Sequence, residues 1–229
     1  MDRALTTKDV RRSPSGAKYT QRRQNVLGAA AKLFAEKGYE ATSIGEIAES
    51  VGLLKGSLYY YAPSKEDLLF SIIREVHDKG RKLVERFTDS DSDPVTQLRE
   101  IIEAGATFVI DHRDMNIISM RDFRALTERR QQELESGRMV MWHYLRSLIA
   151  RGRNEGYFRS DVDVVVVTSG ILGAINYLPT WYESGRPPKA ERMARGYAQF
   201  LVEGLLAPAP APAHAPVPAR PKAKGSARH

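Results

Sequence analysis

Residues 42–69 read TSIGEIAESVGLLKGSLYYYAPSKEDLL, and this stretch decides the fold of the N-terminal part of the chain. Ser43 and Glu46 have the spacing of a capping box, which predicts that a helix begins there. Gly52 turns the chain, and a second short helix is predicted near Lys55–Tyr61. Two short helices around a glycine turn indicate a helix-turn-helix unit.

The second of these helices has the composition of a DNA-reading helix. Leu54 and Leu58 lie one turn apart, and we expect them to hold it against the core. Its outward residues are then Lys55, Gly56, Ser57, Tyr59 and Tyr60. Lysine reaches guanine or phosphate, hydroxyls donate to phosphates or base edges, and glycine lets the backbone approach closely. At neighbouring helix starts, Thr42, Ser43 and Lys65 are predicted to contact phosphates.

Apolar residues at helical spacing continue through the rest of the chain. They predict further helices at about 20–37, 64–87, 94–111, 117–126, 127–151, 162–182 and 189–206. We therefore expect an all-α protein, with a three-helix helix-turn-helix domain at 20–66 and a larger helical bundle at 67–206. The Ser/Pro/Gly-containing residues 1–19 and the Ala/Pro-rich residues 207–229 are expected to be disordered.

Charge is uneven along the 229 residues, whose formal total is +7. Residues 1–24 carry +5 and residues 207–229 carry +4, which leaves −2 for the body. Basic arms beside a DNA-reading module add attraction for phosphates, although a solubilising role is an equal alternative. The chain has no cysteine, which excludes disulfides and thiolate metal sites and favours a reducing compartment. No secretory signal is expected, and we predict a cytoplasmic protein.

The most apolar segment is 162–182. Its run from 164 to 178 is shorter than the ~20 residues that a bilayer requires, and Asp161, Asp163 and Pro179 bracket it. Residues 164–167 also have strand character. We expect a buried helix and no membrane partner, because small residues at close spacing (Gly170, Gly173 and Ala174) suit tight helix packing.

A family resemblance rests on the residues of the N-terminal domain. The matching residues are Gly38, Tyr39, Ala41, Thr42, Ser43, Ile47, Ala48, Gly52, the run Lys55–Tyr61 and the run Ser64–Leu69. Over about residues 20–70 the chain resembles the TetR family of transcriptional regulators. The resemblance implies a homodimer, a DNA-reading head, and a C-terminal domain at 67–206 that binds an effector and dimerises. By position it implies DNA contacts from Thr42, Lys55, Gly56, Ser57, Tyr59, Tyr60, Tyr61 and Lys65.

Two positions depart from the usual pattern of the family. Ala62 stands where an aromatic residue is common, which leaves open that Tyr61 turns inward and makes no DNA contact. Leu54 stands where serine is common, and it is shared with a subset that controls lipid and steroid breakdown. That subset points to an acyl-CoA or another hydrophobic effector.

Effector pockets in helical bundles are mostly apolar, with a few polar groups that orient the ligand. The candidate lining residues are Phe108, His112, Met120, Phe123, Trp142, Leu145, Asn176 and Tyr177, for each of which a core position is the alternative. Arg121 and Arg124 are candidates for an anionic ligand or for a solvated face. By resemblance, the helices near 162–184 and 189–206 form the dimer interface.

No catalytic or metal-binding residues are predicted. The chain lacks a phosphate-cradling glycine loop and a His-Glu-x-x-His pair, and its histidines show no ligand spacing. We expect a ligand-responsive regulator that binds double-stranded operator DNA, most simply a repressor released by a small apolar or acyl-type effector. Two alternatives stay open: a non-specific architectural DNA-binding protein, and a helical ligand-binding dimer with a degenerate DNA head.

Overall fold

The computed structural model describes residues 14–183 and 188–207. Within these ranges the chain is helical apart from its connections and an isolated β-bridge between Phe158 and Leu206. The elements are α2 (Pro14–Lys37), α3 (Ile44–Ser50), α4 (Lys55–Leu58), α5 (Lys65–Glu85), α6 (Pro94–Asp111), α7 (Arg113–Arg121), the 3-10 helix η1 (Phe123–Ala125), α8 (Glu128–Asn154), α9 (Val164–Trp181) and α10 (Ala190–Glu203). The expected all-α fold is confirmed.

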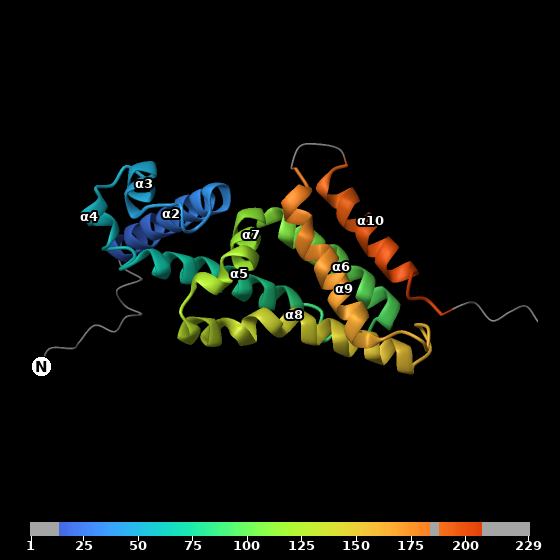
Figure 1. Cartoon of the computed structure of the whole chain (residues 1–229). Coiled ribbons are helices and arrows are strands. Elements are labelled where there is room, and N and C mark those ends of the chain that lie inside the picture. The colour runs from blue at the N-terminus through green and yellow to red at the C-terminus, as the bar shows by residue number, and fades with distance from the viewer. Residues whose placement is uncertain (1–13, 184–187, 208–229) are drawn as a thin grey trace, which may run out of the picture.

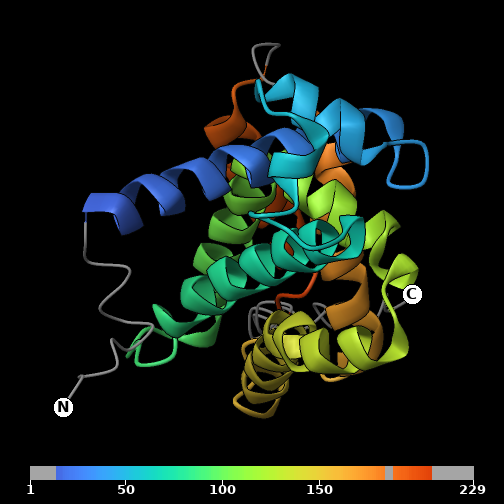
Figure 2. The ribbon, with the colours of Figure 1, turned by 90° about the vertical axis from the view of Figure 1, so that its left-hand side faces the viewer.

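The helices form a small N-terminal head and a larger bundle (Figure 1). The head consists of α2, α3 and α4, and α5 runs from it into the bundle. In the bundle, α6 packs against α8, α9 and α10, while α7 contacts α2 as well as α5 and α9. Figure 2 shows the first turns of α2 extending beyond the other helices of the head.

The helix starts follow the expected caps. Ser43 and Glu46 form a complete capping box at α3, and the Ser64 side chain accepts the Asp67 amide at α5. Pro94 occupies the first turn of α6, where its missing N–H costs nothing. One start differs: α2 begins at Pro14, so residues 14–19 are helical rather than disordered. The rest of the expected arms, 1–13 and 208–229, lies outside the described residues.

The core of the head continues into the bundle. Its centre consists of Val26, Ala30, Phe34, Ile47, Leu58, Leu68, Leu69 and Ile72, all of which are buried. The same cluster includes Ile118 of α7 and Leu134 of α8. The head is therefore packed on α7 and α8, and it is not joined to the bundle by α5 alone.

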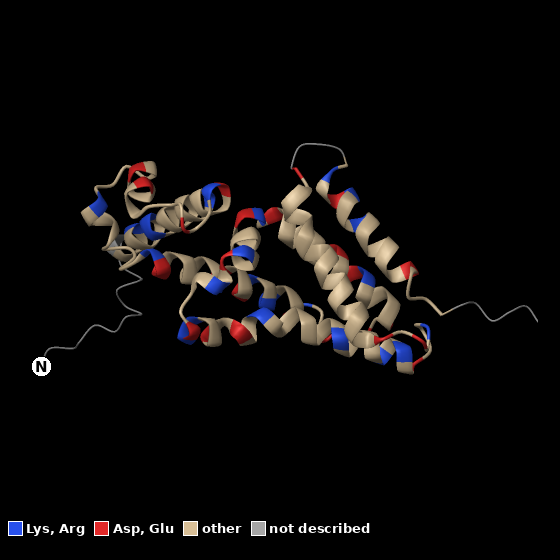
Figure 3. Cartoon of the chain, in the orientation of Figure 1, with Lys and Arg blue, Asp and Glu red and all other residues tan. Residues whose placement is uncertain are grey.

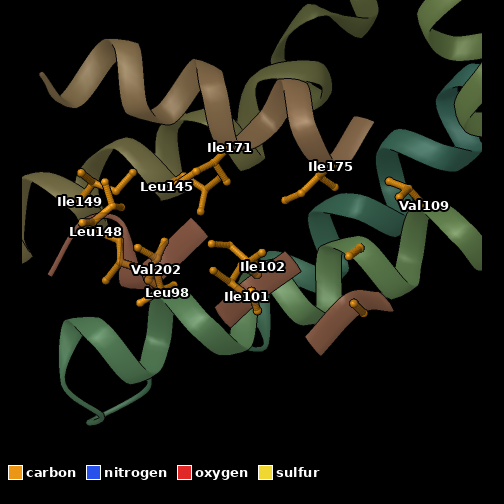
Figure 4. Packing of buried hydrophobic residues seen from close by; sticks show 14 of the residues in the cluster. Leu98, Ile101, Ile102, Val109, Leu145, Leu148, Ile149, Ile171, Ile175 and Val202 are labelled. Atoms are coloured by element: carbon orange, nitrogen blue, oxygen red, sulfur yellow. The ribbon is translucent and has the colours of Figure 1, made fainter. Parts of the chain in front are cut away.

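A second core fills the bundle (Figure 4). Leucine and isoleucine side chains of α6 and α8 meet Ile171 and Ile175 of α9 and Val202 of α10. At the end of α8, Gly152 lies against the buried ring of Phe158, and an added Cβ would overlap that ring. This close approach lets the chain turn back and lay α9 over the same core.

The apolar segment is helical, as expected, but it is not a buried helix. α9 is long and apolar enough to span a membrane by length and composition, yet only 28% of it is buried within the chain. Val166, Tyr177 and Trp181 of α9 are exposed, and so is Phe200 of α10. Ile171, Ile175 and Leu178 occupy the opposite, buried side of α9. One face of the α9–α10 region is therefore apolar and uncovered in the single chain.

Candidate DNA-reading face and effector pocket

The outer face of α4 is open. Lys55, Gly56, Ser57, Tyr59 and Tyr60 are all exposed, as the helix-turn-helix pattern predicts. Lys55 makes no hydrogen bond or ion pair with any residue in the described part of the chain. Lys55 is the one charged residue of α4. Figure 3, in the orientation of Figure 1, shows basic (blue) colour on α4 at the end of the head that lies away from the bundle. The face is available to a molecule approaching from outside.

Gly56 has no internal reason to be glycine. Its backbone does not adopt a positive φ, and a Cβ added there would meet nothing within 4 Å. Glycine inside a helix costs roughly 0.5–1 kcal/mol relative to alanine. The described part of the protein therefore leaves room for a side chain at Gly56, and an outside molecule could approach this backbone closely.

The support behind α4 differs from the expected pair of leucines. Leu58 is fully buried, but Leu54 is 80% exposed. Leu54 is the N-cap residue of α4 and has an extended backbone, which directs its side chain away from the core. Ala62, buried just after the helix, takes part in the packing instead.

Tyr61 and Tyr60 are braced by Tyr19 from the early part of α2. The rings of Tyr19 and Tyr61 are stacked with their centroids 5.4 Å apart, and Tyr61 is half-buried against the core of the head. Tyr19 also meets the ring of Tyr60 edge-on at 5.4 Å. The helical extension that was expected to be disordered therefore positions Tyr60 and Tyr61, which follow α4; the helix ends at Leu58 and not at Tyr61 as predicted.

Thr42 departs from its predicted role. It is only 1% exposed, and its hydroxyl donates to the carbonyl oxygen of Gly38 at 2.8 Å. Lys65 is also committed internally, because its ammonium group donates to the carbonyls of Tyr39 and Glu40 and lies over the Tyr39 ring. These two residues stabilise the turn before α3, and their side chains do not extend toward the open face.

Ser43 is exposed, but its cap is already satisfied. Its Oγ accepts the Glu46 amide, and its own amide donates to the Glu46 carboxylate at 2.8 Å. The Lys37 ammonium and Ser43 lower the pKa of Glu46 to about 2. The anion at the start of α3 is therefore the protein's own carboxylate, and only the Ser43 hydroxyl proton is left to donate to a phosphate.

A cavity of about 390 Å³ lies among α5, α6, α7, η1, α8 and α9. It is lined by Val76, His77, Gly80, Gly105, Phe108, Val109, Asn116, Ser119, Met120, Phe123, Arg124, Gly137, Arg138, Val140, Met141, Leu172, Ile175 and Asn176. This volume falls at the lower end of the range for small-molecule sites. Of the predicted lining residues, Phe108, Met120, Phe123 and Asn176 are among those that surround it.

The other four predicted residues do not line this cavity. Leu145 is fully buried in the core of the bundle, and Tyr177 is 64% exposed on the outer side of α9. The ring of His112 stacks on the ring of Phe108, and its Nδ1 lies 3.1 Å from the Phe108 carbonyl oxygen. Trp142 faces Arg146 and His143 on another side of α8.

Sequence reasoning missed His77, which holds α5 to α7. Its Nε2 lies 3.0 Å from the Ser119 hydroxyl, and its Cβ would be 3.1 Å from a Cβ added at Gly137 of α8. Its signal was a polar residue one turn after Ile73, where the apolar stripe of α5 should continue. Gly105 also lines the cavity and was not predicted to do so. Its signal was a glycine within the apolar face of α6.

Burial lowers the pKa of His77, so its ring is neutral near pH 7. The nearby Arg138 adds to this lowering, while the Leu134 carbonyl, Asp78 and Glu135 oppose it. The Nδ1 atom is buried and has no partner at hydrogen-bond geometry. The part of the cavity lining that His77 forms is therefore polar but uncharged.

The helix that lines the cavity also contacts the head. Asn116, Ser119 and Met120 of α7 face the cavity. The next residue, Arg121, donates to the carbonyl oxygens of Phe34 and Ala35 near the end of α2. Arg121 therefore links α7 directly to α2 of the head.

A second link joins α8 to the start of α5. Arg130 pairs with Glu66 and Asp67, and the Thr127 amide donates to the Glu66 carboxylate at 3.0 Å. Among the described residues there is no cluster of histidine and acidic side chains that could hold a metal ion. The head thus has an open face on α4, and the bundle has a cavity. The contacts of Arg121 with α2 and of Arg130 with α5 connect the two parts.

Two family models match the chain. Residues 26–72 match the model for bacterial regulatory proteins of the tetR family, and residues 91–205 match that for the tetracyclin repressor-like C-terminal domain. The first match covers most of the head, including its open face. The second covers half of the chain and includes most of the cavity lining.

Several known proteins are similar over nearly their whole length. The HTH-type transcriptional repressor KstR2 of Rhodococcus jostii (strain RHA1) is 30% identical, over 82% of this chain and 92% of that protein. The structure of the ketosteroid transcriptional regulator KstR2 of Mycobacterium tuberculosis has a TM-score of 0.77 and 28% identity, covering 81% of this chain and 95% of that one. AibR in complex with isovaleryl coenzyme A and operator DNA has a TM-score of 0.72 and 25% identity, covering 82% and 99%.

The open helix-turn-helix face, the bundle cavity and both family matches lead to the same assignment. No enzyme is indicated by the family or by these relatives. The chain belongs to the TetR family and is a ligand-responsive, DNA-binding transcriptional repressor.

Proposed function

We propose that the protein recognises an operator through the outer face of α4. The observation that carries this is the exposed set Lys55, Gly56, Ser57, Tyr59 and Tyr60. Lysine and the hydroxyls supply donors for bases and phosphates, and the bare backbone at Gly56 allows close approach. Ser43 contributes a hydroxyl from the start of α3.

Leu54 joins this proposed face. It is 80% exposed and directly precedes Lys55. An exposed leucine here gains nothing from the protein core, but apolar side chains read the methyl group of thymine in the major groove. Tyr61, Thr42 and Lys65 are left with positioning roles, because their side chains pack against or hydrogen-bond to the head itself.

We also propose that two chains associate through α9 and α10. Val166, Tyr177 and Phe200 are 64–77% exposed in the single chain. Cβ atoms added at Gly170 or Gly173 would meet nothing within 4 Å, so a second helix can approach α9 closely there. A continuous apolar face of this kind marks an interaction site, and two-fold symmetry is the commonest way to cover it.

A bilayer is a poorer partner for the same face. Ile171, Ile175 and Leu178 on the other side of α9 belong to the core of the bundle. Insertion of α9 into a membrane would remove these side chains from the core. A helix that is buried on one side and apolar on the other fits a subunit interface, and we propose a cytoplasmic homodimer.

The bundle cavity is the proposed effector site. AibR, a similar protein, is known in complex with isovaleryl coenzyme A and operator DNA, which supports a small apolar or acyl-type effector. Ligand binding against Asn116, Ser119 and Met120 would displace α7, and Arg121 would carry the displacement to α2. Altered spacing of the two heads would then release the operator.

The DNA part of this proposal is tested by selection from a random duplex library with the purified full chain. We expect enrichment of an inverted repeat whose half-sites lie about one helical turn, ~34 Å, or a multiple of it apart. Equal retention of all duplexes at matched salt would contradict operator recognition and favour the architectural alternative.

The interface is tested by light scattering on the purified protein. A dimer has twice the chain mass of 25.7 kDa. Tyr177→Glu places a charge on the apolar face of α9 and should shift the mass toward that of one chain. Tyr157→Glu is the matched control, because Tyr157 is exposed at 42% in the link before α9. Identical masses for both variants would refute this interface.

A further inference from the structure

The charged residues that line the bundle cavity are all basic. None of its lining residues is an aspartate or glutamate, whereas two are arginines, Arg124 and Arg138. Arg138 is already neutralised by Glu135, with nitrogen–oxygen distances of 2.6 and 2.9 Å, and it lies over the Phe123 ring. An occupant of this cavity meets positive charge and no negative charge from the lining.

Arg124 is the cation without a partner. It is exposed on η1 at the edge of the cavity, and it makes no hydrogen bond, ion pair or ring contact with any residue in the described ranges. Arginine carries five donors in a planar fork that matches carboxylate, sulfonate and phosphate groups. The exposed Met120 lies near it on α7, which makes this edge the mouth of the cavity.

Another part of the cavity lining, around Gly105, is apolar. A Cβ added at Gly105 would lie 3.8 Å from Ile175 Cδ1 and 3.9 Å from Met141 Cε, so the missing side chain adds space between these residues. Asn176 also lines the cavity, and its side-chain amide makes no hydrogen bond with any described residue. A ligand group with a carbonyl oxygen would satisfy that amide.

We propose that the effector is an amphipathic anion, with its charged end on Arg124 and its apolar end at Gly105. This assignment rests on the cavity being the effector site of the proposed function. The shared chemistry is an apolar body with a carboxylate, sulfonate or phosphate at one end. Because the cavity holds only about 390 Å³, the larger part of a bulky carrier would lie outside, beyond the arginine.

Two fluorescent probes with the same aromatic rings test this proposal. 8-Anilinonaphthalene-1-sulfonate carries a sulfonate, and N-phenyl-1-naphthylamine lacks it. Each is titrated into the full-length wild type, Arg124→Ala, Arg124→Lys and Arg129→Ala. Arg129 is a matched control, because it is another exposed arginine with no hydrogen bond or ion pair among the described residues, but it lies on α8 outside the cavity.

We expect Arg124→Ala to weaken sulfonate binding by about tenfold, because it removes a charge-assisted hydrogen bond that solvent at this exposed position screens in part. Binding of the neutral probe should change less than about twofold. Arg124→Lys should recover part of the loss, and Arg129→Ala should match the wild type. An unchanged ratio of the two affinities in Arg124→Ala would overturn the proposal.

Occupancy of the cavity is tested by Gly105→Leu, which fills its apolar part. Both probes should then bind more weakly, and sulfonate binding that survives unchanged would also overturn the proposal. Thermal unfolding of each variant checks that it is folded. Operator selection uses the ligand-free wild type, so failure of the anion proposal and failure of DNA recognition are separate outcomes.

Discussion

Replacement of Lys55 by alanine tests the proposed DNA-reading face. The measured quantity is the affinity for DNA and its dependence on salt. Lys55 is exposed and has no internal partner, so its removal leaves no unpaired group in the protein. By contrast, Lys65 bonds to two carbonyls of the turn before α3, and its removal would disturb the fold. We therefore expect Lys55→Ala to keep the melting temperature and the dimer mass.

The effect on binding follows from counter-ion release. Each phosphate neutralised by a lysine adds about 0.9 to the slope of log affinity against log salt, so two copies in a dimer contribute about 1.8. Between about 50 and 200 mM salt, the wild type should then lose roughly 12-fold more affinity than the variant. If Lys55 reads guanine instead, discrimination against the wrong base should fall by about 1–3 kcal/mol per contact.

The assay is a gel-shift or fluorescence-anisotropy titration with a selected operator and a scrambled duplex at several salt concentrations. Lys82→Ala is the control, because Lys82 is an exposed lysine near the end of α5, away from the head. The control should leave both slope and affinity unchanged. If Lys55→Ala also changes neither the slope nor the operator preference, Lys55 does not contact DNA, and the open face of α4 has been misinterpreted.

Substitutions at three further positions probe the head and the cavity. Gly56→Ala should stabilise the protein by up to about 1 kcal/mol in thermal unfolding and yet weaken operator binding, because its Cβ meets only an outside partner; undiminished binding would remove Gly56 from the face. Tyr19→Ala should lower operator affinity several-fold at unchanged dimer mass, while Tyr19→Phe, which retains the ring contacts with Tyr60 and Tyr61, should match the wild type. The lowered pKa of His77 means that the unfolded state takes up its proton first as the pH falls below about 6.5, so stability should decrease there by at most about 1.4 kcal/mol per pH unit. His77→Gln should flatten that decrease in denaturant unfolding at fixed protein concentration, and an unaltered pH profile would assign the effect to other groups.

The head was predictable because its helices are marked by local signals. Ser43 with Glu46 and Ser64 with Asp67 satisfy amides within one turn, so their role can be read from spacing alone. The orientation of Leu54 was not predictable in this way. As the N-cap residue it has an extended backbone, and the helical spacing that links it to Leu58 does not apply there.

The cavity was predictable only in part, because rotation of a long helix decides which residues face it. Met141 lines the cavity, whereas Trp142, the next residue on α8, is turned toward another side. Charged residues surround much of α8, so its apolar periodicity does not select one face. The contribution of His77 depends on α7 packing beside α5, which is a tertiary contact between residues 42 positions apart.

Three residues that helix propensity, ion pairing and core packing do not explain lie at the surfaces where we propose that another molecule binds. Gly56 weakens a helix without relieving any clash, Arg124 has no ion-pair partner among the described residues, and Phe200 is 77% exposed. Each is unfavourable or neutral in the single chain, while elsewhere caps, cores and ion pairs agree with the fold. Such departures concentrate at functional sites, because selection there acts on the bound state. A duplex, an amphipathic anion and a second subunit would each remove one of these three departures.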